Sequence, residues 1–192
     1  MNIFNTDTDD DRGQVGIGTL IIFIALVLVA AVAAGVLVNT AGLLQSQAEE
    51  TGQDAQSQVG NQIDVVSATG TVDDTDELVQ NTELVVKKSA GSDPIDLEEA
   101  TIQYTSSSAS ETLQSGGGAG DFDTTSISGE SETVLTNTGD RIEISFDISE
   151  FDGDGLDEGE SATLRIVDQS GATTTYVLNP PQTFGERSVV DL

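Results

Sequence analysis

One apolar run dominates this sequence. It reads Gly13-Gln14-Val15-Gly16-Ile17-Gly18-Thr19-Leu20-Ile21-Ile22-Phe23-Ile24-Ala25-Leu26-Val27-Leu28-Val29 and continues to Leu43-Leu44. No charged residue lies between Arg12 and Glu49. A helix of about 20 apolar residues crosses a bilayer, and this run is longer and apolar on every side. The rest of the chain is too polar to wrap it, so we expect a helix that is covered by lipid or by other molecules.

The composition indicates a folded, strongly acidic protein. The chain has 192 residues, which leaves room for one ordinary domain beyond the helix, and it carries 34 acidic against 6 basic residues, a net charge of −28. Such a charge repels nucleic acid, so we expect no nucleic-acid partner. Disorder and a surface adapted to high salt are the two competing interpretations of the acidity. Well-patterned strands beyond residue 82 favour the second.

Few residues suited to catalysis are present. The sequence contains no cysteine and no histidine. Disulfides and thiolate metal sites are therefore excluded, and the usual general base and the commonest zinc ligand are missing. The acidic residues form no constellation that marks any of them as catalytic. We expect no enzyme and no required cofactor.

A distinctive junction lies before the apolar run. Residues 1–13 are polar, whereas an ordinary secretory signal places its small-residue cleavage site after its apolar region. No Ala-x-Ala site closes the run here, and the junction at Arg12-Gly13 precedes it. Arg12 is also the only basic residue before Lys87, which favours a cytoplasmic N-terminus.

Three segments carry a resemblance to a known family. They are Arg12-Gly13-Gln14-Val15-Gly16-Ile17-Gly18-Thr19-Leu20-Ile21, Leu28-Val29-Ala30-Ala31-Val32-Ala33-Ala34-Gly35-Val36-Leu37 and Asn39-Thr40-Ala41-Gly42. Together they resemble the N-terminus of archaeal flagellins (archaellins), particularly haloarchaeal ones. The resemblance implies a class III, prepilin-like leader that a membrane aspartyl peptidase cuts after Gly13. Arg12 and Gly13 would then flank the cut, and Gln14 would begin the mature chain.

The resemblance also implies a function. It indicates a subunit of an extracellular swimming filament, the archaellum, made of this chain and other archaellins. The precursor would reside in the cell membrane and meet the leader peptidase, the assembly platform and the motor. Two alternatives stay open. An adhesive pilin uses the same assembly chemistry but normally carries Glu at the fifth mature position, where this chain has Gly18. A monomeric membrane-anchored binding domain would keep its N-terminus uncut.

Small residues recur in the second half of the apolar run. They are Ala30, Ala31, Ala33, Ala34, Gly35, Ala41 and Gly42, and they include the spacing Ala31-x-x-x-Gly35. Small residues let helix backbones approach closely, so Ala30, Ala31, Ala34, Gly35 and Gly42 are the predicted packing positions of a filament core. In a simple membrane anchor these residues would have no special meaning. The cleavage-type junction favours the filament.

The remainder predicts a neck and a β domain. Residues 45–62 continue the helix in polar form, and a bend or an end is expected near Gly52 and Gly60, because glycine costs about 1 kcal/mol relative to alanine in a helix. A period of two predicts strands at residues 63–72, 83–88, 100–105, 132–136, 141–148, 162–168 and 173–178. Residues 96–99 are predicted as a helical turn, 106–121 as a flexible loop and 169–172 as a hairpin turn. The core should contain Ile142, Ile144, Phe146 and Ile148.

The predicted fold class is therefore α+β. Residues 1–13 are the leader, residues 14–62 the hydrophobic helix and neck, and residues 63–192 an outer domain with an immunoglobulin-like β-sandwich.

One loop has the chemistry of a cation site. Residues 150–160 alternate carboxylates with glycines, as calcium loops do, and Asp152, Asp154, Asp157 and Glu158 are the predicted ligands of Ca²⁺ or another divalent cation. The loop departs from the EF-hand pattern at both ends, and the alternative is an ordinary acidic loop. No asparagine is followed by Ser or Thr at the second position, so N-glycosylation is not expected.

Overall fold

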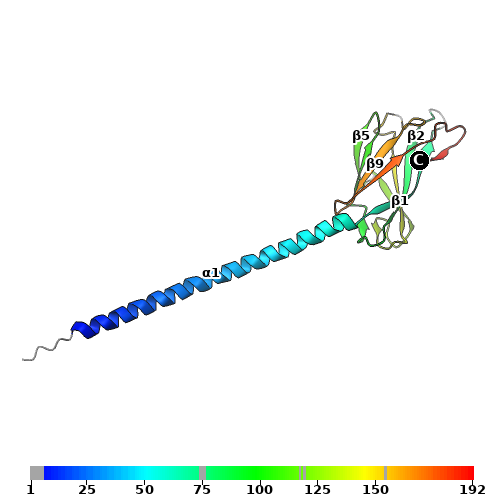
Figure 1. The fold of residues 1–192 in the computed structure, drawn as a ribbon. Coiled ribbons are helices and arrows are strands. Elements are labelled where there is room, and N and C mark those ends of the chain that lie inside the picture. Colours follow the sequence, from blue (N-terminus) through cyan, green and yellow to red (C-terminus); the bar gives the residue numbers. More distant parts are fainter. Residues whose placement is uncertain (1–6, 74–76, 117, 119, 154) are drawn as a thin grey trace, which may run out of the picture. The chain divides into compact units, whose positions relative to one another are not determined.

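The computed structural model describes residues 7–73, 77–116, 118, 120–153 and 155–192, with the backbone alone for residues 7–12. The chain divides into two compact units, Met1–Gly52 and Gln53–Leu192. Figure 1 shows one long helix and one domain built of strands. This is the α+β architecture predicted from the sequence.

Helix α1 spans Asp7–Gly60. It begins upstream of the Arg12-Gly13 junction and runs through Gly52 without interruption, so that glycine does not end the helix. The good helix formers around Gly52, mostly Glu, Gln and Ala, offset the cost of about 1 kcal/mol that one glycine imposes. The helix ends at Gly60, as expected, and the Asn61 N–H donates to the Ser57 carbonyl at 2.8 Å.

Two antiparallel sheets form the rest of the second unit. The five-stranded sheet has the order β11 (Val189–Asp191), β1 (Ile63–Val72), β2 (Val79–Lys88), β8 (Arg141–Asp147) and β6 (Asp123–Ser128). The four-stranded sheet has the order β10 (Thr173–Leu178), β9 (Ala162–Val167), β4 (Thr101–Thr105) and β5 (Ser110–Gln114). A short ribbon pairs β3 (Ile95–Asp96) with β7 (Val134–Leu135).

The inner faces of the two sheets share one hydrophobic core. Both sheets contribute to a single cluster of buried side chains, among them Leu84, Val86, Ile142, Ile144, Ile102, Leu113, Leu164 and Ile166. The four predicted core residues of β8 and its end, Ile142, Ile144, Phe146 and Ile148, are each at most 3% exposed, which confirms the prediction. The domain is therefore a β-sandwich, and the outer faces of its sheets point away from each other.

The hairpin between β9 and β10 is confirmed. The two strands pair over their whole lengths, and the Gly171 N–H donates to the Asp168 carbonyl at 3.0 Å. Gly171 has φ 81°, which L side chains rarely adopt. The Asp168 Oδ1 atom accepts hydrogen bonds from the backbone N–H groups of Ser170 and Ala172, both at 2.9 Å, and fixes the turn.

Two local predictions are wrong. The segment 106–121 is not simply a loop, because it contains β5, which pairs with β4 and buries Leu113 completely. A single apolar residue among polar ones gives too weak a period to be recognised. Residues 96–99 form no helical turn. Asp96 pairs with Val134 in β3, and residues 97–99 form a bend in which the Ala100 N–H donates to the Leu97 carbonyl at 3.3 Å.

Candidate assembly site

Helix α1 exposes large apolar side chains that the described chain does not cover. Every such residue from Val15 to Leu44 is more than half exposed, from 52% at Val27 to 73% at Val38. The described residues include one helix long and apolar enough to cross a membrane, and it lies near the N-terminus. An apolar surface of this extent marks a region that contacts lipid or protein.

The two threonine hydroxyls within the apolar run bond to their own helix. The Thr19 hydroxyl donates to the Gly16 carbonyl and the Thr40 hydroxyl to the Val36 carbonyl, both at 2.9 Å. Hydroxyls bonded in this way need no water. The run is therefore compatible with a covering of lipid or of other apolar helices.

The predicted packing residues lie on one side of the helix. At about 100° per residue, Ala31, Gly35 and Gly42 fall within one row, while Ala30 and Ala34 occupy the adjacent row. Apart from the adjacent helix backbone, no described part of the chain lies within 4 Å of a Cβ built at Gly35 or Gly42. Another helix could approach the backbone closely along this side. Packing at these five positions stays a prediction.

The predicted leader junction lies within the helix. Gly13 and Gln14 are both exposed, and a Cβ built on Gly13 would meet no described atom within 4 Å beyond the adjacent helix backbone. The side chain of Arg12 lies outside the described residues. The peptide bond after Gly13 is therefore on the surface of α1, and its cleavage stays a prediction.

The predicted cation loop turns its first ligand inward. The Asp152 carboxylate is only 3% exposed, and it accepts hydrogen bonds from the Tyr104 hydroxyl at 2.8 Å and the Ser108 hydroxyl at 2.5 Å. The ring of Phe151 meets the Tyr104 ring edge-on, with centroids 5.1 Å apart. Asp152 thus serves as the buried partner of a core tyrosine.

These contacts shift the pKa values of both groups. Burial raises the pKa of the Tyr104 hydroxyl well above its ordinary value of 10.0, and the hydrogen bond to the negative Asp152 raises it further. Burial also raises the pKa of the Asp152 carboxyl. Hydrogen bonds from Ser106, Ser108 and Tyr104 together outweigh that effect, so the pKa of Asp152 lies below its ordinary value of 3.8.

The other predicted ligands are dispersed. Glu158 accepts a hydrogen bond from the Phe184 N–H at 2.7 Å, Asp157 is exposed, and Asp154 lies outside the described residues. Across the described part of the chain, no three His, Cys, Asp or Glu residues are grouped so as to hold a metal ion. Cation binding by this loop stays a prediction. The sequence did carry a signal for the partner of Asp152, because a tyrosine facing a core needs an acceptor for its hydroxyl.

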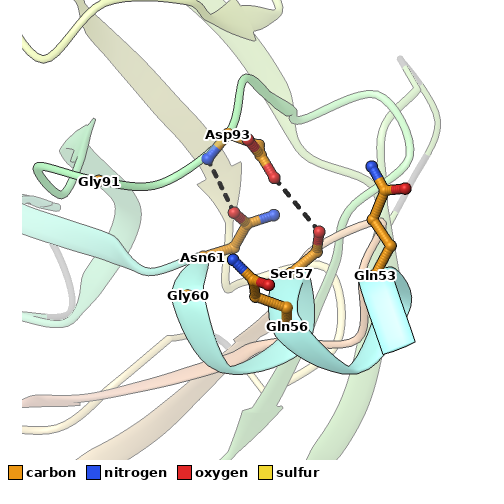
Figure 2. Close-up of a pocket in the computed structure, with 7 residues that line it drawn as sticks. All are labelled: Gln53, Gln56, Ser57, Gly60, Asn61, Gly91 and Asp93. Carbon is orange, nitrogen blue, oxygen red and sulfur yellow. Dashed lines mark hydrogen bonds between the residues drawn. The ribbon is translucent and has the colours of Figure 1, made fainter. Parts of the chain in front are cut away.

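The last two turns of α1 belong to the second unit and make polar contacts with the sandwich. Asn61 is 6% exposed, accepts from the Asp93 N–H at 2.9 Å and donates to the Ser170 hydroxyl at 3.3 Å. Ser57 donates to the Asp93 carboxylate at 3.2 Å. Figure 2 shows the two bonds to Asp93 beside a polar groove, which is lined by Gln53, Gln56, Ser57, Gly60, Asn61, Gly91 and Asp93. The sequence predicted a neck here but none of these contacts.

Comparison with known proteins identifies the family. Residues 13–178 match the model of archaeal-type flagellin. The chain is 47% identical to flagellin B2 of Halobacterium salinarum over 98% of both chains, and 43% identical to flagellin B1 of Natrialba magadii over 96% of both.

Solved structures share the fold. The archaeal flagellum of Methanospirillum hungatei strain JF1 matches with a TM-score of 0.70 at 20% identity, covering 92% of this chain and 99% of that one. The crystal structure of archaeal flagellin FlaB1 from Methanocaldococcus jannaschii matches with a TM-score of 0.62 at 16% identity, covering 68% and 95%. With the full-length similarity to the haloarchaeal proteins, the conclusion is that the chain belongs to the archaeal-type flagellin family.

Proposed function

We propose that this chain is a structural subunit that polymerises, with copies of itself and with other flagellins, into the extracellular filament that archaea rotate to swim. The observation that carries the proposal is the exposed apolar helix of a flagellin-family chain, with every large side chain from Val15 to Leu44 more than half exposed. Identical helices in a filament core would cover this surface for one another.

The proposed assembly moves the apolar helix from one apolar environment, the membrane, to another, the filament core. The precursor rests in the cell membrane through α1, the leader peptidase removes residues 1–13, and the mature helix moves from lipid into the filament at the assembly platform. The family match begins at residue 13, which supports a boundary at that point. Lipid is as apolar as a neighbouring helix, so close packing along the small-residue side has to favour the transfer.

The subunit itself does no chemistry in this proposal. Its work is mechanical, and the motor acts on the filament as a whole. An adhesive pilin would assemble in the same way, so deletion of the gene separates the two functions: loss of swimming supports the flagellin, and loss of attachment alone supports the pilin.

The first test is the N-terminus of the protein in sheared filaments. We expect the intact mass and N-terminal sequence of a chain that starts at Gln14. A Gly13→Val variant should instead keep its leader and remain in the membrane fraction, because a bulky branched side chain would replace the glycine at which the proposed cut is made. Gly16→Ala, three residues downstream, is the matched control and should be processed. A wild-type chain that retains residues 1–13 in the membrane would favour a membrane-anchored domain.

A further inference from the structure

The outer face of the four-stranded sheet carries no acidic residue. The strand registers place twelve outward residues in three rows across β10, β9, β4 and β5. The rows are Thr173, Val167, Thr101 and Gln114; Thr175, Arg165, Gln103 and Thr112; and Val177, Thr163, Thr105 and Ser110. We call this surface the neutral face. In a chain with 34 acidic residues, a whole sheet face without one requires a reason.

The opposite side of the sandwich is the contrast. Six carboxylates lie on the outer face of the five-stranded sheet, at Asp64, Glu83, Asp123, Glu143, Asp147 and Asp191. Two cations, Lys87 and Arg141, share that face, and Lys87 is bound to Asp64 at 3.6 Å. We call this surface the acidic face. Acidic residues spread over a surface adapted to high salt explain the acidic face. They do not explain why the neutral face has none.

The neutral face has a free cation at its centre. Arg165 lies between Gln103 of β4 and Thr175 of β10 in the middle row, and it is exposed. Its guanidinium makes no ion pair or hydrogen bond with any residue that the structure describes. Arginine is enriched at the buried centres of protein interfaces, where its guanidinium can pair with carboxylates. An exposed, unpaired arginine at the centre of an otherwise uncharged face is therefore suited to meet carboxylates of another molecule.

The positions of the two faces allow the same contact to repeat from one subunit to the next. They lie on opposite sides of one sandwich, so the neutral face of one copy can meet the acidic face of the next in the same way along a whole row. Such head-to-tail contacts build open filaments, whereas a face that binds its own copy closes a dimer. Strand spacings of about 4.8 Å and rises of about 3.3 Å per residue give the face roughly 400 Å². This is about half of what a stable dimer buries per partner, so the contact would add to helix packing rather than replace it.

We propose that the neutral face docks on the acidic face of a neighbouring copy of this chain, with Arg165 pairing with that copy's carboxylates. The inference rests on the proposed filament function. It goes further by assigning which face of one outer domain contacts which face of the next. The charge difference between the two faces would then give each row of subunits a single direction.

Cross-linking tests the assignment directly, because the chain has no cysteine of its own. Gln103→Cys on the neutral face and Glu143→Cys on the acidic face would be introduced singly and together in cells that express this chain as their only flagellin. Sheared filaments would be treated with a short flexible bismaleimide. We expect a ladder of dimers, trimers and longer products from the double variant alone. Gln103→Cys with Thr183→Cys, an exposed residue outside both faces, is the control pair.

The outcomes separate the inference from the function beneath it. Dimers from Gln103→Cys alone would show that the neutral face binds the neutral face of another copy. Filaments without cross-links would show that the neutral face binds no other subunit. Either result overturns the inference but leaves the proposed filament function intact. A chain absent from sheared filaments would overturn the proposed function itself.

Charge reversal gives an independent test. Arg165→Glu should lower the yield of sheared filament about tenfold, because like charges would then meet across the contact. Arg187→Glu makes the same change of charge at an exposed arginine outside both faces and should match the wild type. Adding Glu143→Arg to Arg165→Glu should restore most of the yield. Equal losses from Arg165→Glu and Arg187→Glu would overturn the inference.

Discussion

At the scale of single residues, Asp152 is a predicted cation ligand whose side chain the structure places in the core. Its spacing within residues 150–160 is that of a cation ligand, yet its side chain is 3% exposed and bonded to Tyr104 and Ser108. The spacing of carboxylates along a chain does not fix the direction in which each one points. The direction follows from which core residue needs an acceptor, and here that residue is Tyr104.

The Tyr104–Asp152 pair predicts how stability depends on pH. The pKa of Tyr104 is raised in the folded state, so above pH 10 the unfolded chain loses this proton while the folded chain retains it. The free energy of unfolding should then fall by about 1.4 kcal/mol per pH unit from this group. Tyr104→Phe should remove that part of the alkaline fall, measured by denaturant unfolding at several pH values. An identical alkaline slope in both proteins would contradict the assignment.

At the acid end the sign is opposite. Asp152 has a lowered pKa, so its contribution is fully present above the ordinary carboxyl value of 3.8 and is lost as the pH falls through the lower folded value. We expect Asp152→Asn to flatten this part of the acid fall. Asp157→Asn removes an exposed carboxyl from the same loop and is the control for the loss of one charge there.

Gly155 predicts a large loss of stability for a small change. Its φ is 137°, and a Cβ at this position would lie 2.6 Å from the Val79 carbonyl oxygen. Gly155→Ala should therefore lower the free energy of unfolding by about 2–3 kcal/mol. Gly153→Ala, at φ 61° with no described atom within 4 Å beyond its chain neighbours, should cost less, about 1 kcal/mol. Equal costs in denaturant titrations would show that the contact with Val79 is unimportant.

At the scale of elements, the end of α1 is fixed by side chains rather than by its own sequence. The last turn contains no basic residue, and the Ser92 hydroxyl donates to the final carbonyl, that of Gly60, at 3.3 Å. Asn61 then joins the helix end to the segment before β3 and to the β9–β10 hairpin. The junction therefore depends on three segments that are distant in sequence.

Asn61→Ala should loosen this junction. The substitution removes the bonds to Asp93 and Ser170 and leaves the part-buried Asp93 N–H without its acceptor, at a cost of about 1 kcal/mol. Hydrogen exchange at the Asp93 amide should accelerate accordingly. Gln56 lines the same groove and makes no hydrogen bond within the described chain, so Gln56→Ala is the matched control. Unchanged exchange in Asn61→Ala would show that the helix end is held by other contacts.

At the scale of the whole molecule, charge dominates the response to salt. The net charge of −28 includes six carboxylates on the acidic face, so self-repulsion opposes folding at low ionic strength. The screening length falls from about 10 Å at 0.1 M to about 3 Å at 1 M salt. We expect the midpoint of thermal unfolding of the sandwich to rise across this range. A midpoint independent of salt would indicate that the acidity serves another purpose.

The sequence alone determined the long helix, the sandwich class, most of the strands and the core face of β8. These features follow from periodicity and from the length of an uncharged run, which are properties of neighbouring residues. Strand β5, the inward turn of Asp152 and the bonds of Asn61 were decided only by tertiary structure. Each depends on partners far away in sequence. Leu113 is buried because β5 pairs with β4, Asp152 turns inward to bond to Tyr104, and Asn61 bonds to Asp93. The neutral face belongs to the same group, because its twelve residues come from four separate strands and become one surface only when the registers are set.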